Sequence, residues 1–451
     1  MSAPCRLGIL NSHPIQYFAP LYRYLAGNPR LDLTVLYGSR QGVERYRDPG
    51  FEADVRWDVP LLDGYRHAFL RNWSPVPGAD RPLGILNPGV ISALARGRFD
   101  ALWVHGYAYA THLLALLEAR ALGLPVLLRG ETHLLLERRR GAVLGQDQGQ
   151  EQGDDQGQGD DQEQGDDQGQ GDDQGQGDDQ RQGDEQRQDD GWTEGRPPRR
   201  ERQLVRWIVR GSAACLAIGS RNAAYYRSLG VPEERIFLVP YVVDNHYFAM
   251  RTAALREQRA ELRRELGLPP HACVLLFASK LVPRKRASDL LAAYARLRAE
   301  GADAALAFVG SGPTEARLRT AAADVPGVHF FGFRNQAELP GFFAAADIFC
   351  LPSIDEPWGL VINEAMAAGL PVVAAAEVGA AADLVRDGHN GATHRGRDVE
   401  GLTAALRPLV ADGDLRARMG RASSTIISGW GFSEAEAGLL RALEAVAPRG
   451  A

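Results

Sequence analysis

Short apolar runs alternate with amphipathic segments of helical period along most of the chain. The apolar runs before residue 240 are RLGIL, LDLTVLY, ALWVH, PVLLRG, CLAIG and IFLVP, and those after it are VLLFAS, ALAFVG, VHFFG, IFCLP and PVVAA. Runs of this length are typical of buried strands, and their alternation with helices is typical of a parallel sheet with helices on both faces. The pattern therefore predicts an α/β fold of two doubly wound parallel-sheet domains joined near residues 240 to 250.

A chain of 451 residues with 45% hydrophobic positions is long enough for two such domains, each with its own core. We expect an N-terminal domain over residues 1–240, a C-terminal domain over residues 241–428 and a terminal helix over residues 429–451. In doubly wound sheets, ligands bind beyond the carboxyl ends of the strands. The residues that follow each strand are therefore the first candidates for function.

An acidic repeat interrupts the pattern between residues 146 and 190. Gly-Asp-Asp recurs from Gly153 to Gly177, and no apolar residue occurs between Gln146 and Gly191. A segment that buries nothing cannot offset the entropy of ordering, so we expect a disordered insert in a surface loop, with a regulatory or tethering role as the alternative. The segment has 17 acidic and 2 basic residues, so the rest of the chain carries +9 although the whole chain carries −6.

A basic folded body suits anionic partners such as nucleoside diphosphates or an anionic membrane surface; no nucleic-acid partner is predicted. The stretch RPPRRERQLVRWIVR, residues 196–210, is basic and has an apolar stripe at Leu204, Trp207 and Ile208. It is interpreted as a solvated helix packed by that stripe, and a helix lying on anionic lipid is the alternative.

The cysteines and the N-terminus indicate a reducing compartment. The four cysteines lack C-x-x-C spacing and three lie in apolar runs, so we expect buried thiols and no disulfide or zinc framework. No N-terminal leader and no apolar stretch of about 18 residues is evident. We therefore expect a cytoplasmic protein without a membrane span, and a peripheral contact at the inner face of the membrane stays open.

Two motifs follow strands of the second domain. The loop Ser279 to Arg286 has four basic residues where a strand opens into a helix, which suits a phosphate, although a solvated basic loop is the alternative. The turn Gly310-Ser311-Gly312-Pro313 either brings backbone close to a ligand or packs the following helix.

A third motif, IDEPWGLVINEAMAAG, follows the run IFCLPS. Pro357 and Gly359 indicate a loop and the next residues form a helix, so the amides of Trp358, Gly359 and Leu360 lie at a helix N-terminus that attracts an anion. Glu356 in the loop and Glu364 in the helix are suited to accept hydrogen bonds from sugar hydroxyls. The alternative, two solvated surface charges, is disfavoured by the apolar neighbours of Glu364.

The order of these motifs resembles the retaining, nucleotide-sugar-dependent glycosyltransferases of family 4, which have the GT-B fold of two Rossmann-like domains facing a cleft. The resemblance extends over most of residues 100–433 apart from the insert, and is strongest from Val239 to Gly391. The family's Glu-x-seven-Glu motif matches Glu356 and Glu364. The resemblance also implies that the terminal helix, which begins near Trp430, returns to the first domain.

The resemblance implies roles for several residues. Glu364 would hold the ribose hydroxyls, Lys280 and Lys285 the diphosphate, and Glu356 the donor hexose. The nucleotide site would also include Gly310, Gly312, Trp358, Gly359 and Leu360. His105, at a strand end, matches the family histidine that reaches the donor sugar. Lys280 departs from the family's usual Arg, which keeps the charge but loses the bidentate fork.

The acceptor side departs further from the family. The first strand is followed by Asn-Ser-His-Pro-Ile-Gln-Tyr-Phe instead of a glycine-rich loop, so His13 and Gln16 offer side-chain hydrogen bonds to an acceptor. His133 is a weaker candidate there and Glu131 weaker still. No Asp-x-Asp follows a strand, so no metal and no other cofactor is expected.

The sequence thus predicts a hexosyltransferase that uses a nucleoside-diphosphate sugar and retains the anomeric configuration. Its acceptor would be a sugar, a lipid-linked precursor or a polysaccharide, in glycan, polysaccharide or glycolipid biosynthesis. The alternatives are a non-catalytic nucleotide-sugar-binding or scaffold protein and a GT-B epimerase.

Overall fold

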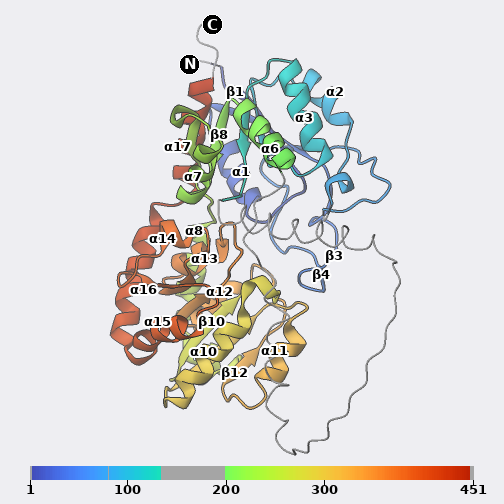
Figure 1. The fold of residues 1–451 in the computed structure, drawn as a ribbon. Coiled ribbons are helices and arrows are strands. Elements are labelled where there is room, and N and C mark those ends of the chain that lie inside the picture. Colours follow the sequence, from blue (N-terminus) through green and yellow to red (C-terminus); the bar gives the residue numbers. More distant parts are fainter. Residues whose placement is uncertain (1–2, 80, 134–198, 447–451) are drawn as a thin grey trace, which may run out of the picture. The chain divides into compact units, whose positions relative to one another are not determined.

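A computed structural model describes residues 3–79, 81–133 and 199–446 (Figure 1). The acidic repeat at residues 146–190, for which disorder was predicted, lies outside the described residues. Residues 1–133 and 206–451 form one compact unit and residues 134–205 a second, of which only the beginning of helix α6 is described.

The first sheet has seven strands in the order β5-β2-β1-β6-β7-β8-β9, and all neighbouring pairs are parallel. All six apolar runs predicted before residue 240 form strands of this sheet. The edge strand β5 was missed because three of its four residues are exposed, so that it lacks an apolar run. The strands are β1 (Cys5–Asn11), β2 (Leu31–Tyr37), β5 (Arg66–Phe69), β6 (Ala101–His105), β7 (Val126–Arg129), β8 (Ala214–Ala217) and β9 (Ile236–Leu238).

The second sheet has six parallel strands in the order β12-β11-β10-β13-β14-β15. The five predicted runs form five of them, and only β15 lacks an apolar run. The two parallel sheets confirm the predicted fold class, whereas the domain limits at residues 240 and 428 stay predictions. The strands are β10 (Cys273–Ala278), β11 (Ala304–Val309), β12 (Val328–Phe330), β13 (Ile348–Leu351), β14 (Val372–Ala375) and β15 (Gly391–His394).

Helices occupy most connections between the strands (Figure 1). Three of them begin at an aspartate whose carboxylate accepts a backbone N–H of the first turn, which satisfies a donor that the helix itself leaves unpaired. The helices are α1 (Phe18–Ala26), α2 (Gly89–Gly97), α3 (Ala110–Ala121), α6 (Arg199–Gly211), α7 (Ser220–Ser228), α8 (Asn245–Arg256), α9 (Arg259–Glu265), α10 (Ala287–Ala299), α11 (Glu315–Ala321), α12 (Leu339–Ala345), α13 (Leu360–Ala367), α14 (Ala381–Leu384), α15 (Val399–Ala411), α16 (Gly413–Ser428) and α17 (Phe432–Val446).

A short antiparallel hairpin, β3 (Tyr46–Asp48) and β4 (Ala53–Val55), follows β2 and was not predicted. Its strands have three residues each, which is too short for a period-2 pattern to be visible in the sequence. The terminal helix α17 packs against β8 and β9 of the first sheet and contacts α1. Asn28 and Arg30 bind Glu436 and Glu444 of α17 at 2.7 and 2.5 Å.

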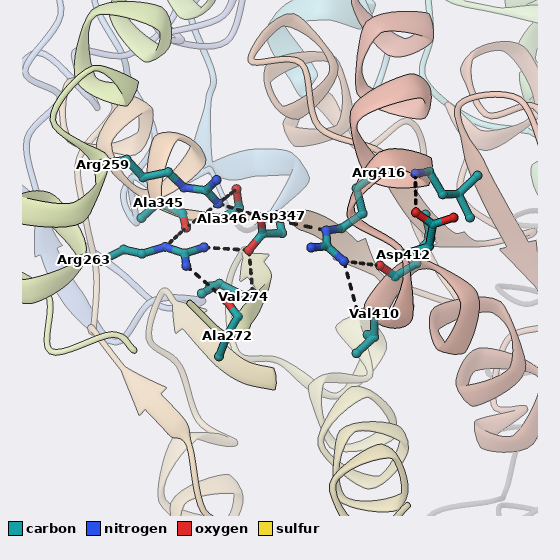
Figure 2. A network of polar contacts seen from close by, with 12 residues as sticks. Arg259, Arg263, Ala272, Val274, Ala345, Ala346, Asp347, Val410, Asp412 and Arg416 are labelled. Carbon is teal, nitrogen blue, oxygen red and sulfur yellow. Dashed lines mark hydrogen bonds and ion pairs between the residues drawn. The ribbon is translucent and has the colours of Figure 1, made fainter. Parts of the chain in front are cut away.

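Asp347, just before β13, joins the second sheet to the helices beside it (Figure 2). Its carboxylate accepts hydrogen bonds from Arg259 at 2.7 Å, from Arg263 at 2.6 Å and from the amide of Val274 at 2.8 Å. Arg416 approaches it from α16 at 4.0 Å. One carboxylate therefore connects α9, β10 and α16.

The remaining sequence expectations for the fold concern thiols and membrane spans. All four cysteines are free thiols, and Cys215, Cys273 and Cys350 are buried, as predicted. Within residues 3–79, 81–133 and 199–446, no helix has the length and apolar character needed to cross a membrane.

Candidate functional site

A cavity of about 930 Å³ is lined by residues that follow strands of both sheets and by the β3–β4 hairpin. Its size is in the range of small-molecule sites. Three of the sequence-predicted residues, His105, His133 and Gly312, are not part of its lining among the described residues. The other ten line it: His13, Gln16, Lys280, Lys285, Gly310, Glu356, Trp358, Gly359, Leu360 and Glu364.

Glu364 is the most unusual group of this cavity. It is 0% exposed, and neither of its carboxyl oxygens makes a hydrogen bond of ordinary geometry to a described residue, although the Tyr17 hydroxyl lies close enough to interact with it. Burial raises the pKa of Glu364 to about 8, and the nearby Tyr17 hydroxyl lowers it by less. A buried carboxyl group with so little hydrogen bonding is costly, above all in its charged form. A ligand that brings hydroxyl groups into the cavity would satisfy it.

Glu356 forms a buried ion pair with Lys285. Both residues are less than a tenth exposed, and the Nζ of Lys285 donates to Oε2 of Glu356. Arg284 Nη1 lies 3.5 Å from the same oxygen. Burial lowers the pKa of Lys285, an effect that the charge of Glu356 opposes. The loop that precedes α13, which carries Glu356, and the basic loop Ser279 to Arg286 therefore meet at one wall of the cavity.

Lys280 forms an ion pair with Asp48, which ends strand β3. Its Nζ lies 2.8 and 3.0 Å from the two carboxylate oxygens of Asp48. The sequence assigned Lys280 to a phosphate, and in the structure its ammonium binds a carboxylate of this chain.

The two glycines after β11 allow close backbone contacts. A Cβ on Gly310, whose φ is +131°, would lie 2.0 Å from the carbonyl oxygen of Ser279. A Cβ on Gly312, whose φ is +151°, would lie 2.6 Å from that of Leu281 and 2.7 Å from that of Gly50. These close contacts are made to the basic loop and to the hairpin and not to the following helix, and the approach of this turn to a ligand stays a prediction.

Helix α13 begins at the predicted loop. Gly359 at its N-cap has a φ of +95°, a conformation that favours glycine. The indole of Trp358 stacks on Trp430 with ring centroids 5.6 Å apart and donates to Asn363 at 2.9 Å. The tryptophan therefore fixes the loop through its ring, while the first backbone amides of the helix remain beside the cavity.

The three histidines differ in their surroundings. Burial lowers the pKa of His13 to about 4, so this cavity residue is neutral at pH 7. The Nε2 of His105 lies 2.8 Å from the Tyr22 hydroxyl, and burial followed by the charge of Arg129 lowers its pKa well below the ordinary value. His133 is buried, and its Nε2 lies 3.3 Å from the carbonyl oxygen of Glu356.

Sequence reasoning missed or ranked low several residues of the lining. The hairpin contributes Tyr46, Arg47 and Asp48, for which the sequence has no motif. Glu131, ranked below His133 from the sequence, lines the cavity and accepts a hydrogen bond from the Tyr241 hydroxyl at 2.7 Å. Its position two residues after the end of strand β7 was the available signal, because the segments that follow strands form this site.

No group of three or more His, Cys, Asp or Glu side chains that could hold a metal ion occurs in the part of the chain that the structure describes. The expectation that no metal is required stays a prediction.

Two parallel sheets whose strand ends line one cavity define the GT-B class of fold. The solved structure of Anabaena HepE in complex with UDP and glucose has this fold and superposes with a TM-score of 0.63 at 16% identity, covering 97% of this chain and 99% of that chain. Residues 258–425 match the family model of glycosyl transferases group 1.

Curated relatives align over part of their length. The D-inositol 3-phosphate glycosyltransferase of Streptomyces coelicolor is 37% identical over 193 residues, which are 40% of this chain and 42% of the relative. The GDP-mannose-dependent alpha-(1-6)-phosphatidylinositol monomannoside mannosyltransferase of Mycolicibacterium smegmatis is 36% identical over 229 residues, 49% of this chain and 58% of the relative. The chain thus spans about half the length of the curated relatives that it matches.

Proposed function

We propose that the protein transfers a hexose from a nucleoside-diphosphate sugar to an acceptor hydroxyl with retention of the anomeric configuration. The observation that carries the proposal is Glu364, a fully buried carboxyl group on the wall of the cavity that makes no hydrogen bond of ordinary geometry to the described residues and has the Tyr17 hydroxyl nearby. Ribose hydroxyls are donors without charge and would satisfy it. The match of residues 258–425 to the family model of glycosyl transferases group 1 supports a nucleotide-sugar donor.

The charge of the departing diphosphate is the main charge to be stabilised in this reaction. Lys280, Lys285 and the amides at the beginning of α13 line the cavity and would bind the phosphates. The acceptor oxygen would bond to the anomeric carbon on the face from which the diphosphate leaves, and a phosphate oxygen would take the acceptor proton. Glu356, held by Lys285, would orient the hexose. His105 would act on the sugar only through a rearrangement, because its Nε2 is bound to Tyr22.

The acceptor is proposed to be a sugar, a lipid-linked precursor or a polysaccharide. The names of two relatives, for D-inositol 3-phosphate and for a phosphatidylinositol monomannoside, support an acceptor rich in hydroxyl groups. His13 and Gln16, from the loop between β1 and α1, line the cavity and would contact the acceptor.

A peripheral contact with an anionic membrane is part of the proposal. Leu204 and Trp207 of α6 are each 51% exposed, whereas Ile208 is buried, so the predicted apolar stripe is covered only in part. Exposed apolar side chains on a basic helix suit an anionic lipid surface. Flotation with anionic vesicles at low salt would test it, and protein that stays at the bottom of the gradient would contradict it.

The experiment for the donor site is a thermal-shift panel with UDP, GDP, ADP and their hexose conjugates. We expect one nucleotide series to stabilise the wild type and Glu400→Ala, an exposed control on α15, and to leave Glu364→Ala unshifted. A panel without any shift would contradict the proposal. Turnover of the stabilising sugar nucleotide, measured as released nucleoside diphosphate, would then separate a transferase from a binding-only scaffold and from an epimerase, which releases none.

A further inference from the structure

The β3–β4 hairpin is docked on the second sheet beside the loops proposed to hold the diphosphate. The Ser311 hydroxyl donates to the carbonyl oxygen of Phe51 at 2.6 Å, and the Phe51 ring lies 4.7 Å from the ring of Phe333. Further along, the side-chain amide of Asn335 donates to the carbonyl oxygen of Arg56 at 2.7 Å. These contacts hold the hairpin on the second sheet independently of the ion pair between Asp48 and Lys280.

Asp48 is oriented by its own hairpin. Its Oδ1 accepts the amides of Gly50 at 2.8 Å and of Phe51 at 3.1 Å, and its Oδ2 accepts the Tyr46 hydroxyl at 3.2 Å. The side chain is buried, with 9% exposed. Both oxygens nevertheless reach the Nζ of Lys280, so the carboxylate is preorganised to bind this ammonium.

Asp48 is ionised at neutral pH. Burial would raise the pKa of its carboxyl, but the hydrogen bond and charge of Lys280, together with the amides of Phe51 and Gly50, outweigh burial and lower it. The Nζ of Lys280 also lies 4.7 Å from the Phe51 ring centroid. The ammonium therefore has an anion and an aromatic face as neighbours before any ligand binds.

A phosphate that binds Lys280 must displace the carboxylate of Asp48 or lie beside it. Two anions at one ammonium repel each other, so either arrangement weakens phosphate binding. We propose that Asp48 competes with the donor diphosphate for Lys280 and thereby sets the affinity of the site for diphosphates. The inference rests on the donor site of the proposed function and adds a residue of the β3–β4 hairpin to it.

The test is calorimetric titration of the full chain with inorganic pyrophosphate, which has the diphosphate and no base or sugar. Asp48→Asn removes the charge and keeps an oxygen for the amides of Gly50 and Phe51. Asp54→Asn is the matched control, because it makes the same charge change on the same hairpin at an exposed position of β4. Both changes are also made in a Lys280→Met background, and urea unfolding midpoints verify the fold of each variant.

We expect Asp48→Asn to bind pyrophosphate about fivefold more tightly than the wild type. A change of this size matches the strongest interactions measured for ion pairs between partly exposed side chains. Asp54→Asn should leave the affinity unchanged, and Asp48→Asn should have no effect when Lys280 is replaced. The inference is overturned if Asp48→Asn binds no more tightly than the wild type, if Asp54→Asn gives the same gain, or if the gain persists without Lys280. A nucleotide panel without any shift would contradict the proposed function and leave this result standing.

Discussion

Glu364 illustrates how a single side chain links stability to ligand binding. The pKa of Glu364 is raised from an ordinary value of 4.5 to about 8, because burial disfavours the charged form of its carboxyl group. The folded chain therefore binds this proton more tightly than the unfolded chain. The resulting stabilisation is fully present below pH 4.5 and is lost as the pH rises through about 8.

The pH dependence of this stabilisation can be tested by substitution of Glu364. Glu364→Gln keeps the shape and removes the ionisation, so the difference in unfolding free energy between variant and wild type should change with pH. We expect the variant to gain about 3 kcal/mol relative to the wild type between pH 5.5 and pH 8.5. Urea unfolding at both pH values measures the gain. If the difference in unfolding free energy between the variant and the wild type is the same at both pH values, the pKa of Glu364 is not raised in the folded protein and the prediction is wrong.

At the scale of elements, Asp347 has a structural role that no sequence motif announced. Its carboxylate joins α9, β10 and α16 through the contacts drawn in Figure 2. Arg263 is only 4% exposed, so its guanidinium depends on this partner and on nearby carbonyl oxygens. Burial raises the pKa of Asp347, but Arg259, the amide of Val274 and Arg263 outweigh that effect and lower it.

Removal of this charge should destabilise the second sheet. We expect Asp347→Ala to cost about 3 kcal/mol, because it leaves a buried guanidinium without its carboxylate. The control is Glu300→Ala, which breaks an ion pair between Glu300 and Arg407. Their side chains are 44% and 52% exposed, so this loss should destabilise the protein far less. Similar losses in both variants, measured by urea unfolding, would contradict a special role for Asp347.

At the scale of the whole molecule, the terminal helix α17 packs on the first sheet although it follows the second in sequence. Gly438 permits this contact, because a Cβ there would lie 1.9 Å from the carbonyl oxygen of Leu238 in β9. The neighbour is backbone and cannot move aside alone. The absence of a side chain at one position therefore determines how closely helix and sheet approach.

A substitution at this position tests the packing. Gly438→Ala should destabilise the protein by about 2 kcal/mol despite the higher helix propensity of alanine, because the helix must shift away from β9. Gly429→Ala is the matched control, since its nearest neighbour would lie 3.8 Å away and its φ is −92°. An unfolding midpoint for Gly438→Ala equal to or above that of the wild type would contradict the close packing.

Much of the fold and part of the site could be predicted from the sequence. Buried parallel strands require continuous apolar runs, so eleven strands were visible as such runs, while β5, β15 and the β3–β4 hairpin had none. The pair Glu356 and Glu364 was visible because its spacing is local, and both residues line the cavity. Apolar runs and the spacing of nearby side chains can be read directly from a sequence, because they involve only residues that are close along the chain.

The contacts that define the site belong to the tertiary structure. Asp48 and Lys280 are 232 positions apart, and nothing in the short hairpin indicates that they meet. The pairing of His105 with Tyr22, the burial of His133 and the place of Glu131 in the cavity likewise depend on which strand ends lie together. The sequence by itself determined the strands, the helices and the chemistry available at their ends, whereas packing decided which of these groups face one another, because that choice depends on contacts between distant segments.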